Sequence, residues 1–128
     1  MKLLLDTHSF VWWRDDSTKL STTAFNAISD ADNEVFISVI AAWELEIKIA
    51  LNKFQLKSTL ENAIREEQDT NRFRVLPVHL AHVFELGRLP LVHRDPFDRL
   101  LIAQAIVEDL TIVTADRNFS DYDVKVLW

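Results

Sequence analysis

Short apolar runs alternate with longer segments of helical periodicity along the whole chain. The short runs are rich in leucine, β-branched and aromatic residues, as in EVFISV, which is typical of strands. The longer segments repeat apolar residues every three or four positions, which is typical of helices. We expect strands at residues 2–5, 34–39, 74–78, 111–114 and 124–127, and helices at residues 10–14, 20–31, 40–54, 58–70, 79–86 and 95–109.

Polar and conformationally special residues mark several of the predicted helix ends. Ser58 with Glu61 three residues later predicts a capping box at the start of the helix over residues 58–70. Gly87 predicts a left-handed residue that ends the helix over residues 79–86. Asp95 predicts an N-cap, because the proline that follows it suits the first helical position.

Strands that alternate with helices predict an α/β fold with a parallel sheet covered on both faces. A chain of 128 residues fits a single domain, residues 1–128, and its hydrophobic content of 48% and charged content of 27% are those of a soluble globular protein. The apolar run at the N-terminus is too short for a signal peptide, and no stretch reaches membrane-spanning length. We therefore expect a cytoplasmic protein with no membrane association.

Three features of the composition exclude or disfavour whole classes of function. The chain has no cysteine, which excludes a disulfide framework and a thiolate zinc site. Gly87 is its single glycine, which excludes the glycine-rich phosphate loops of P-loop and dinucleotide-binding proteins. The net charge of −6 counts against a nucleic-acid-binding surface, which is usually basic, unless bound cations supply positive charge at the point of contact.

Acidic residues stand near the ends of several predicted strands. Asp6 directly follows the first strand, and Asp116 follows the fourth. Glu44 lies in the first turns of the helix after the second strand, and Asp98 lies in the first turn of the helix over residues 95–109. Because sites in parallel sheets form beyond the carboxyl ends of the strands, we expect these four carboxylates to converge at one edge.

Each of these acids also has a purely structural interpretation. Asp98 suits the positive end of a helix dipole, and Glu44 has Lys48 four residues later, at the spacing of a helical ion pair. Asp6 and Asp116 also suit turns. A convergent cluster is harder to explain in this way, because two carboxylates about 4 Å apart repel by roughly 4 kcal/mol at an effective dielectric constant of 20.

Protons or cations neutralise such a cluster. A ligand set made only of oxygen atoms selects Mg²⁺ or Mn²⁺ over zinc. These ions mostly serve phosphate chemistry, in which they activate a water and steady the leaving oxygen. The cluster therefore predicts a hydrolase that acts on phosphate esters, and the metal ions would offset the acidic net charge.

Four segments resemble PIN-domain ribonucleases in sequence and in order: LLLDTHSFVWW, AAWELEIK, HRDPFDRLLIAQA and TIVTADRNF. Within that family the chain is most similar to the VapC-like toxins of bacterial type II toxin–antitoxin pairs, from Met1 to the C-terminus. The resemblance implies a three-layer α/β/α fold with a central parallel sheet of four to five strands. It also implies hydrolysis of RNA phosphodiester bonds with Mg²⁺ or Mn²⁺ as the cofactor, and a cognate antitoxin and a second copy of the chain, in a homodimer, as partners.

The resemblance also assigns roles to individual residues. The acidic residues expected to hold the metal and carry the catalysis are Asp6, Glu44, Asp98 and Asp116. Thr114 and Asn118 stand where the family often has polar residues that support the metal site. Asp95 is a further candidate, with helix capping as its first interpretation. Apart from the resemblance, Arg94, Arg99 and Arg117 lie beside these acids in sequence, which makes them candidates for contacts with flanking phosphates; surface ion pairs are their alternative.

Two other functions stay open at this point. One is a catalytically inactive PIN-like module that binds RNA or a protein. The other is a metal phosphatase that acts on small substrates; its aspartyl form requires a second aspartate two residues after Asp6, where this chain has His8. Incubation with structured RNA and Mn²⁺, against a chelator control, separates the nuclease from the binding module.

The predicted helix over residues 40–54 carries apolar residues on two faces. One face suffices to pack on the sheet: Ile40, Trp43, Ile47, Leu51 and Phe54. Leu45 and Ile49 lie on the opposite face, where a solvated helix is polar. They predict either a second core contact with the helix over residues 58–70 or an exposed surface for a partner. The resemblance to VapC-like toxins favours the exposed surface.

Overall fold

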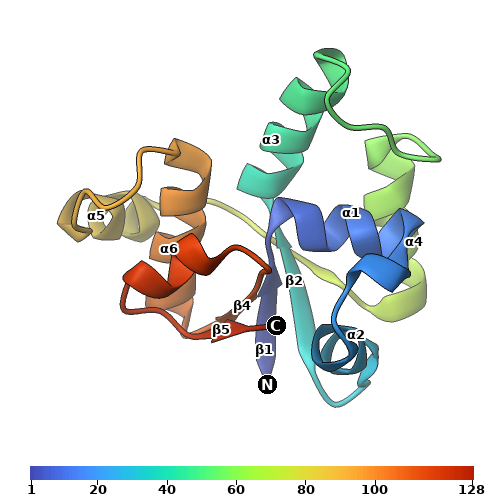
Figure 1. Ribbon diagram of the computed structural model, residues 1–128, viewed down its shortest axis with the longest axis horizontal. Coiled ribbons are helices and arrows are strands. Elements are labelled where there is room, and N and C mark those ends of the chain that lie inside the picture. Colours follow the sequence, from blue (N-terminus) through green and yellow to red (C-terminus); the bar gives the residue numbers. More distant parts are fainter.

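The computed structural model describes all 128 residues and forms one five-stranded sheet with helices on both sides (Figure 1). The strands are β1 (Lys2–Leu5), β2 (Glu34–Ser38), β3 (Arg74–Leu76), β4 (Thr111–Val113) and β5 (Val126–Leu127). Every neighbouring pair is parallel, and the order across the sheet is β3-β2-β1-β4-β5. The predicted α/β fold with a central parallel sheet is confirmed.

Six α-helices surround the sheet: α1 (Thr7–Asp15), α2 (Thr22–Ser29), α3 (Val39–Ala50), α4 (Leu60–Asn71), α5 (Leu80–Arg88) and α6 (Pro96–Glu108). Figure 1 shows α1, α2 and α4 on one side of the sheet and α5 and α6 on the other, with α3 rising from the end of β2. Short 3₁₀ helices cover Ser17–Lys19 and Arg117–Asp121. None of the helices combines the length and the apolar character that crossing a bilayer requires.

The leucines of β1 explain why both faces of the sheet are covered. Leu3 and Leu5 point into the apolar core beneath α1, α2 and α4, whereas Leu4 points into the core beneath α6. All three side chains are completely buried. Alternating residues of a strand point to opposite faces, so a strand that is apolar at every position needs a helical layer on each side.

The strand register brings the residues after three strands to one edge of the sheet. Leu5 of β1 pairs with Ile37 of β2 on one side and with Val113 of β4 on the other. The segments that leave these strands therefore start side by side, at the same edge as the start of α1 and α3. The residues that form the candidate site meet at this edge.

Two predicted helix ends are wrong in detail. Thr59, not Ser58, caps α4, because its hydroxyl accepts a hydrogen bond from the backbone N–H of Asn62 at 3.2 Å. The Ser58 hydroxyl instead donates to the carbonyl of Thr59. Gly87 lies inside α5 and does not have a positive φ, so it does not end the helix. The chain leaves α5 at Leu89 in an extended conformation, which any residue can adopt.

Of the two alternatives for Leu45 and Ile49 on α3, the second core contact is confirmed and the exposed surface is wrong. Leu45 is completely buried, and Ile49 packs against the same core beneath α1 and α4. On the face predicted to pack on the sheet, Trp43, Ile47 and Leu51 are 57%, 38% and 59% exposed. The reason is that α3 continues directly from β2 and projects past the edge of the sheet, so after its first turn it leans on α1 and α4.

Candidate active site at the carboxyl edge of the sheet

Asp6 is a buried carboxylate at the point where β1 becomes α1. Its Oδ1 accepts a hydrogen bond from the backbone N–H of Ser9 at 2.8 Å, which caps α1. Its Oδ2 accepts one from the hydroxyl of Thr114 at 2.6 Å. Burial raises the pKa of Asp6 above its ordinary value, and the hydrogen bonds from Thr114 and Ser9 only partly oppose this effect.

Thr114 joins Asp6 to Asp116. Besides donating to Asp6, its Oγ1 accepts a hydrogen bond from the backbone N–H of Asp116 at 3.0 Å. Asp116 is exposed, and its Oδ1 accepts from the backbone N–H of Asn118 at 2.9 Å, which caps the 3₁₀ helix Arg117–Asp121. The short turn after β4 therefore holds Asp116 beside the carboxylate that follows β1.

Glu44 is a buried carboxylate with two partners from the protein itself. The hydroxyl of Thr7 donates to Oε1 at 2.8 Å, and the ammonium of Lys48 lies 2.7 Å from Oε2. The side chain of Glu44 is 5% exposed and that of Lys48 is 30% exposed. The predicted helical ion pair is present, and it lies inside the acidic cluster rather than on an outer surface.

Asp95 and Asp98 have different roles at the start of α6. Asp95 caps the helix, because its Oδ1 accepts from the backbone N–H groups of Phe97 at 2.9 Å and Asp98 at 3.3 Å, so its predicted capping role is confirmed. The half-buried carboxylate of Asp98 takes part in no hydrogen bond or ion pair. Burial raises its pKa to about 7, with smaller contributions from the charges of Asp95, Glu44, Asp6 and Asp116.

A buried polar contact fixes α3 against α6. The hydroxyl of Ser38, which caps α3, donates to Oε1 of Gln104 on α6 at 2.6 Å. Both residues are completely buried. This contact sets the distance between the helix that carries Glu44 and the helix that carries Asp98.

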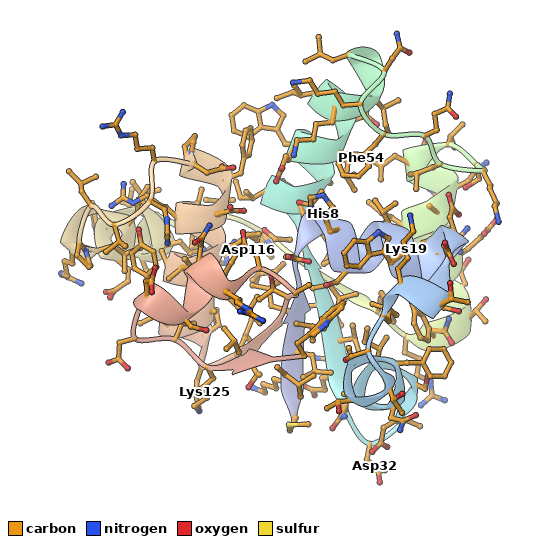
Figure 2. The ribbon with its side chains drawn as sticks, in the orientation of Figure 1. His8, Lys19, Asp32, Phe54, Asp116 and Lys125 are labelled. Atoms are coloured by element: carbon orange, nitrogen blue, oxygen red, sulfur yellow. The ribbon has the colours of Figure 1, made fainter.

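These acids line one pocket of about 200 Å³. Its walls are formed by Asp6, Thr7, His8, Glu44, Lys48, Asp95, Asp98, Asp116 and Phe119. Figure 2 shows His8 and Asp116 close to the end of β1, with Phe54 beyond His8 on the side of α3. Asp6, Glu44, Asp98 and Asp116 converge at one edge, as predicted. Together with Asp95 they give the pocket five carboxylates, against one lysine and one histidine.

A second depression of about 330 Å³ adjoins the first. The two share Asp95, Asp98, Asp116 and Phe119, and the second adds His93, Arg94, Ile102 and Asn118. A ring nitrogen of His93 lies 2.8 Å from the carbonyl of Asn118, which holds the two sides of this depression together. The acidic pocket thus borders a depression that carries the positive side chain of Arg94.

The donor set fits a hard divalent cation in its chemistry. All five acids offer oxygen atoms, no cysteine is present, and Asp98 has no partner within the protein. The side chains are not drawn together around one point: no three histidine or acidic groups lie at the spacing of metal ligands. Roles for Asp6, Glu44, Asp98 and Asp116 as metal ligands therefore stay predictions.

The three candidate arginines differ in position. Arg94 lines the second depression. Arg99 points elsewhere: its Nη2 donates to the carbonyls of Leu86 and Leu89 at the end of α5, at 3.5 and 3.3 Å. Arg117 is exposed and lines neither depression. Contacts of all three arginines with substrate stay predictions, and Arg94 is the one that lines either depression.

Four residues of the pocket are not among the functional residues predicted from the sequence: Thr7, His8, Lys48 and Phe119. In the sequence, His8 only stands where an aspartyl phosphatase would have its second aspartate. Two positions after Asp6, however, it falls on the first turn of α1. The sequence predicts Lys48 only as a surface partner of Glu44. Residues four apart on a helix share one face, however, so a lysine paired with a pocket glutamate lies at the pocket too. The spacing of His8 from Asp6 and of Lys48 from Glu44 could therefore have indicated both residues.

Comparison with known proteins agrees with this architecture. The sequence matches the PIN domain family over residues 3–125. The chain belongs to the PIN-domain family. The resemblance to PIN-domain proteins that the sequence motifs carry is thus confirmed.

Individual relatives lie in the VapC branch that the motifs indicated. The chain is 29% identical over 127 residues to Ribonuclease VapC22 of Mycobacterium tuberculosis. The aligned region covers 94% of this chain and 91% of that protein. Its fold is similar to that of VapBC2 from Rickettsia felis bound to a promoter DNA fragment, with a TM-score of 0.74, 19% identity, and coverage of 99% and 98% of the two chains. It is also similar to VapBC-5 of Mycobacterium tuberculosis, described as a member of the VapBC family of toxin–antitoxin systems, with a TM-score of 0.58, 19% identity, and coverage of 98% and 95%.

Proposed function

We propose that this PIN domain is a Mg²⁺- or Mn²⁺-dependent endoribonuclease and the toxin of a toxin–antitoxin pair, acting in the cytoplasm. The observation that carries the proposal is the pocket in which acids from four separate segments meet, with Asp98 unpaired among them. Similarity to Ribonuclease VapC22 along nearly the whole chain supports RNA as the substrate. The acidic pocket and the positive side chain of Arg94 in the adjoining depression suit an ion and a phosphate side by side.

In this proposal Asp6, Asp98 and Asp116 hold the cation, and Glu44 completes the site directly or through water. A divalent ion held there would activate a water and offset charge on the scissile phosphate. Thr114 and Ser9 each hold one oxygen of Asp6, so the orientation of this carboxylate is fixed. Asp95 anchors the start of α6 and thereby positions Asp98.

The adjoining depression would receive the RNA strand on one side of the scissile phosphate. Arg94 is the residue of that depression able to bind a phosphate oxygen with two N–H groups. Asn118 lies at its edge, with its backbone N–H held by Asp116. Substrate phosphates would therefore approach along a path that ends at Asp98 and Asp116, which with the capping residue Asp95 are the three acids common to both depressions.

The proposed partners are a cognate antitoxin and a second copy of the chain. Neighbours in fold include proteins described as VapBC complexes, which supports an antitoxin partner. An interface on α3 is tested at its exposed residues, because Leu45 is core, whereas Trp43 and Ile47 are exposed. Trp43→Glu should leave the protein folded, and co-purification with the antitoxin and light scattering would show which interaction it breaks.

Incubation of the pure protein with structured RNA tests the enzymatic proposal. We expect cleavage with Mg²⁺ or Mn²⁺, loss of cleavage after exhaustive treatment with EDTA, and recovery when Mn²⁺ is restored. Cleavage that survives chelation would refute the metal dependence. RNA retention without cleavage under all conditions would refute the enzyme and favour the inactive binding module.

A further inference from the structure

Lys48 is the single lysine or arginine side chain that lines the acidic pocket, and its place there is fixed by two contacts. Its ammonium lies 2.7 Å from Oε2 of Glu44, one helical turn earlier on α3. The same ammonium lies 5.4 Å from the centre of the Phe54 ring, within the range of a cation–π interaction. His8 packs edge-on against Phe54 at 5.1 Å, so the ring is itself held.

Glu44 is already neutralised by the protein. One oxygen accepts from Thr7 and the other pairs with Lys48, while the carboxylate is 5% exposed. Removing the cation from a buried ion pair leaves a charge with little solvent to stabilise it, which is strongly unfavourable. A metal ion bound directly by Glu44 would have to displace Lys48 and return its ammonium to water.

The other acids of the pocket lack such a cation. Asp6, Asp98 and Asp116 form no ion pair, and Asp98 accepts no hydrogen bond either. Their negative charge is offset only by hydrogen bonds from Ser9, Thr114 and Asn118 to Asp6 and Asp116. The charge without a cation partner thus belongs to the aspartates of the pocket, and the charge with one belongs to Glu44.

We propose that Lys48 is the resident cation of Glu44 and limits the site to one divalent ion, held by Asp6, Asp98 and Asp116. This inference rests on the proposed metal-dependent function and deepens it. Lys48 takes the place that a second metal ion would otherwise fill. Its side chain, which lines the pocket and is 30% exposed, supplies the second positive charge that faces a bound phosphate.

Counting bound Mn²⁺ by equilibrium dialysis or electron paramagnetic resonance tests this directly, with no need of activity. We expect one Mn²⁺ per chain in the wild type and in Lys48→Arg, which keeps the charge. Lys48→Met keeps the length of the side chain but frees Glu44, and we expect it to bind two. Lys53→Met is the matched control, because Lys53 is exposed, lies outside the pocket and should leave the count at one.

Glu44→Gln gives an independent test should Lys48→Met fail to fold. Since Glu44 is bound to Lys48 rather than to the ion, we expect one Mn²⁺ with an affinity within about threefold of the wild type. A loss of tenfold or more would make Glu44 a direct ligand and overturn the proposal.

Outcomes in the wild type distinguish the two proposals. Two Mn²⁺ per wild-type chain, or an unchanged count in folded Lys48→Met, would overturn the role of Lys48 and leave the metal-dependent nuclease intact. No bound Mn²⁺ in the wild type would overturn the metal dependence itself, and the role of Lys48 with it.

Discussion

Two acidic residues, Glu67 on α4 and Asp98 on α6, show opposite ways of placing a carboxylate within a fold. Glu67 is buried and accepts hydrogen bonds from Trp13 Nε1 at 2.6 Å, Arg14 Nη1 at 2.8 Å and Asn71 Nδ2 at 2.8 Å. Asp98 accepts none, has no cation partner, and has its pKa raised to about 7. Donors of the protein itself occupy the oxygens of Glu67, whereas the oxygens of Asp98 stay available to a ligand.

The difference teaches how to separate structural from functional acids in this protein. Burying a carboxylate lowers the stability of the folded state unless hydrogen bonds and a counter-charge compensate it. Glu67 meets that requirement, and it clamps α4 to α1 through Trp13 and Arg14. Asp98 does not meet it, so it lowers the stability of the protein without a ligand, and the proposed metal site explains why the chain keeps it.

The largest expected effect on stability is at Glu67. Glu67→Gln breaks a buried ion pair and leaves Arg14 paired only with the more exposed Glu66, so we expect a loss of about 3 kcal/mol in the free energy of unfolding, measured with urea. Glu66 pairs with the same arginine at 2.6 Å but its side chain is 58% exposed, so Glu66→Gln should cost less than about 1 kcal/mol. Equal losses in the two variants would contradict the clamp. RNA cleavage per folded molecule should be unchanged in both.

Mn²⁺ should stabilise the wild type but not Asp98→Asn. At a concentration 100 times its dissociation constant, linkage predicts about 2.7 kcal/mol. Because Asp98 must lose its proton to bind the ion, Mn²⁺ should bind about tenfold more weakly at pH 6 than at pH 8. Isothermal titration calorimetry at the two pH values measures this, and equal affinities would show that Asp98 is not a ligand.

Stability without metal should fall as the pH rises from about 4 to about 7. In that interval the folded protein keeps the proton on Asp98 while the unfolded chain has released it, so the folded state binds more protons. The difference between 3.8 and about 7 corresponds to at most about 4 kcal/mol, and solvent at a half-buried site reduces this to about 2 kcal/mol. The stability of Asp98→Asn should decline less over this interval; a decline equal to that of the wild type would contradict the raised pKa.

The smallest expected effect is at the start of α4, the helix that carries Glu67. Thr59→Ala removes the side chain that caps the helix and should cost about 1 kcal/mol of stability. Ser58→Ala removes a hydroxyl that caps nothing, so its effect should be close to zero. Thermal unfolding of the two variants compares them, and a larger loss in Ser58→Ala would restore the capping box that the sequence suggested.

The sequence was sufficient for the sheet and for the meeting of the acids. Strands that are apolar at every position, such as Leu3–Leu5, require a parallel sheet covered on both faces, and its carboxyl edge collects the residues that follow each strand. Asp6 and Asp116 therefore follow from strand ends alone. Asp95 was predictable as a cap because it precedes a proline.

Properties that depend on distant segments were beyond the sequence. Helical periodicity gave α3 two apolar faces, but which one is buried depends on the direction in which the helix leaves the sheet, and Leu45 proved to be core. Arg99 lies beside Asp98 in sequence, yet its guanidinium is taken by carbonyls at the end of α5. That Glu44 is paired inside the pocket and Asp98 is not depends on the packing of α3 against α6.

One substitution, Asp98→Asn, tests the central claim that this acid is kept for a ligand at the expense of stability. At pH 8 without metal we expect a gain of about 1–2 kcal/mol in the free energy of unfolding, together with loss of RNA cleavage when Mn²⁺ is present. Asp69→Asn, at an exposed position on α4, is the matched control and should change neither. An Asp98→Asn protein that is less stable than the wild type, or that cleaves RNA as fast, would contradict the account.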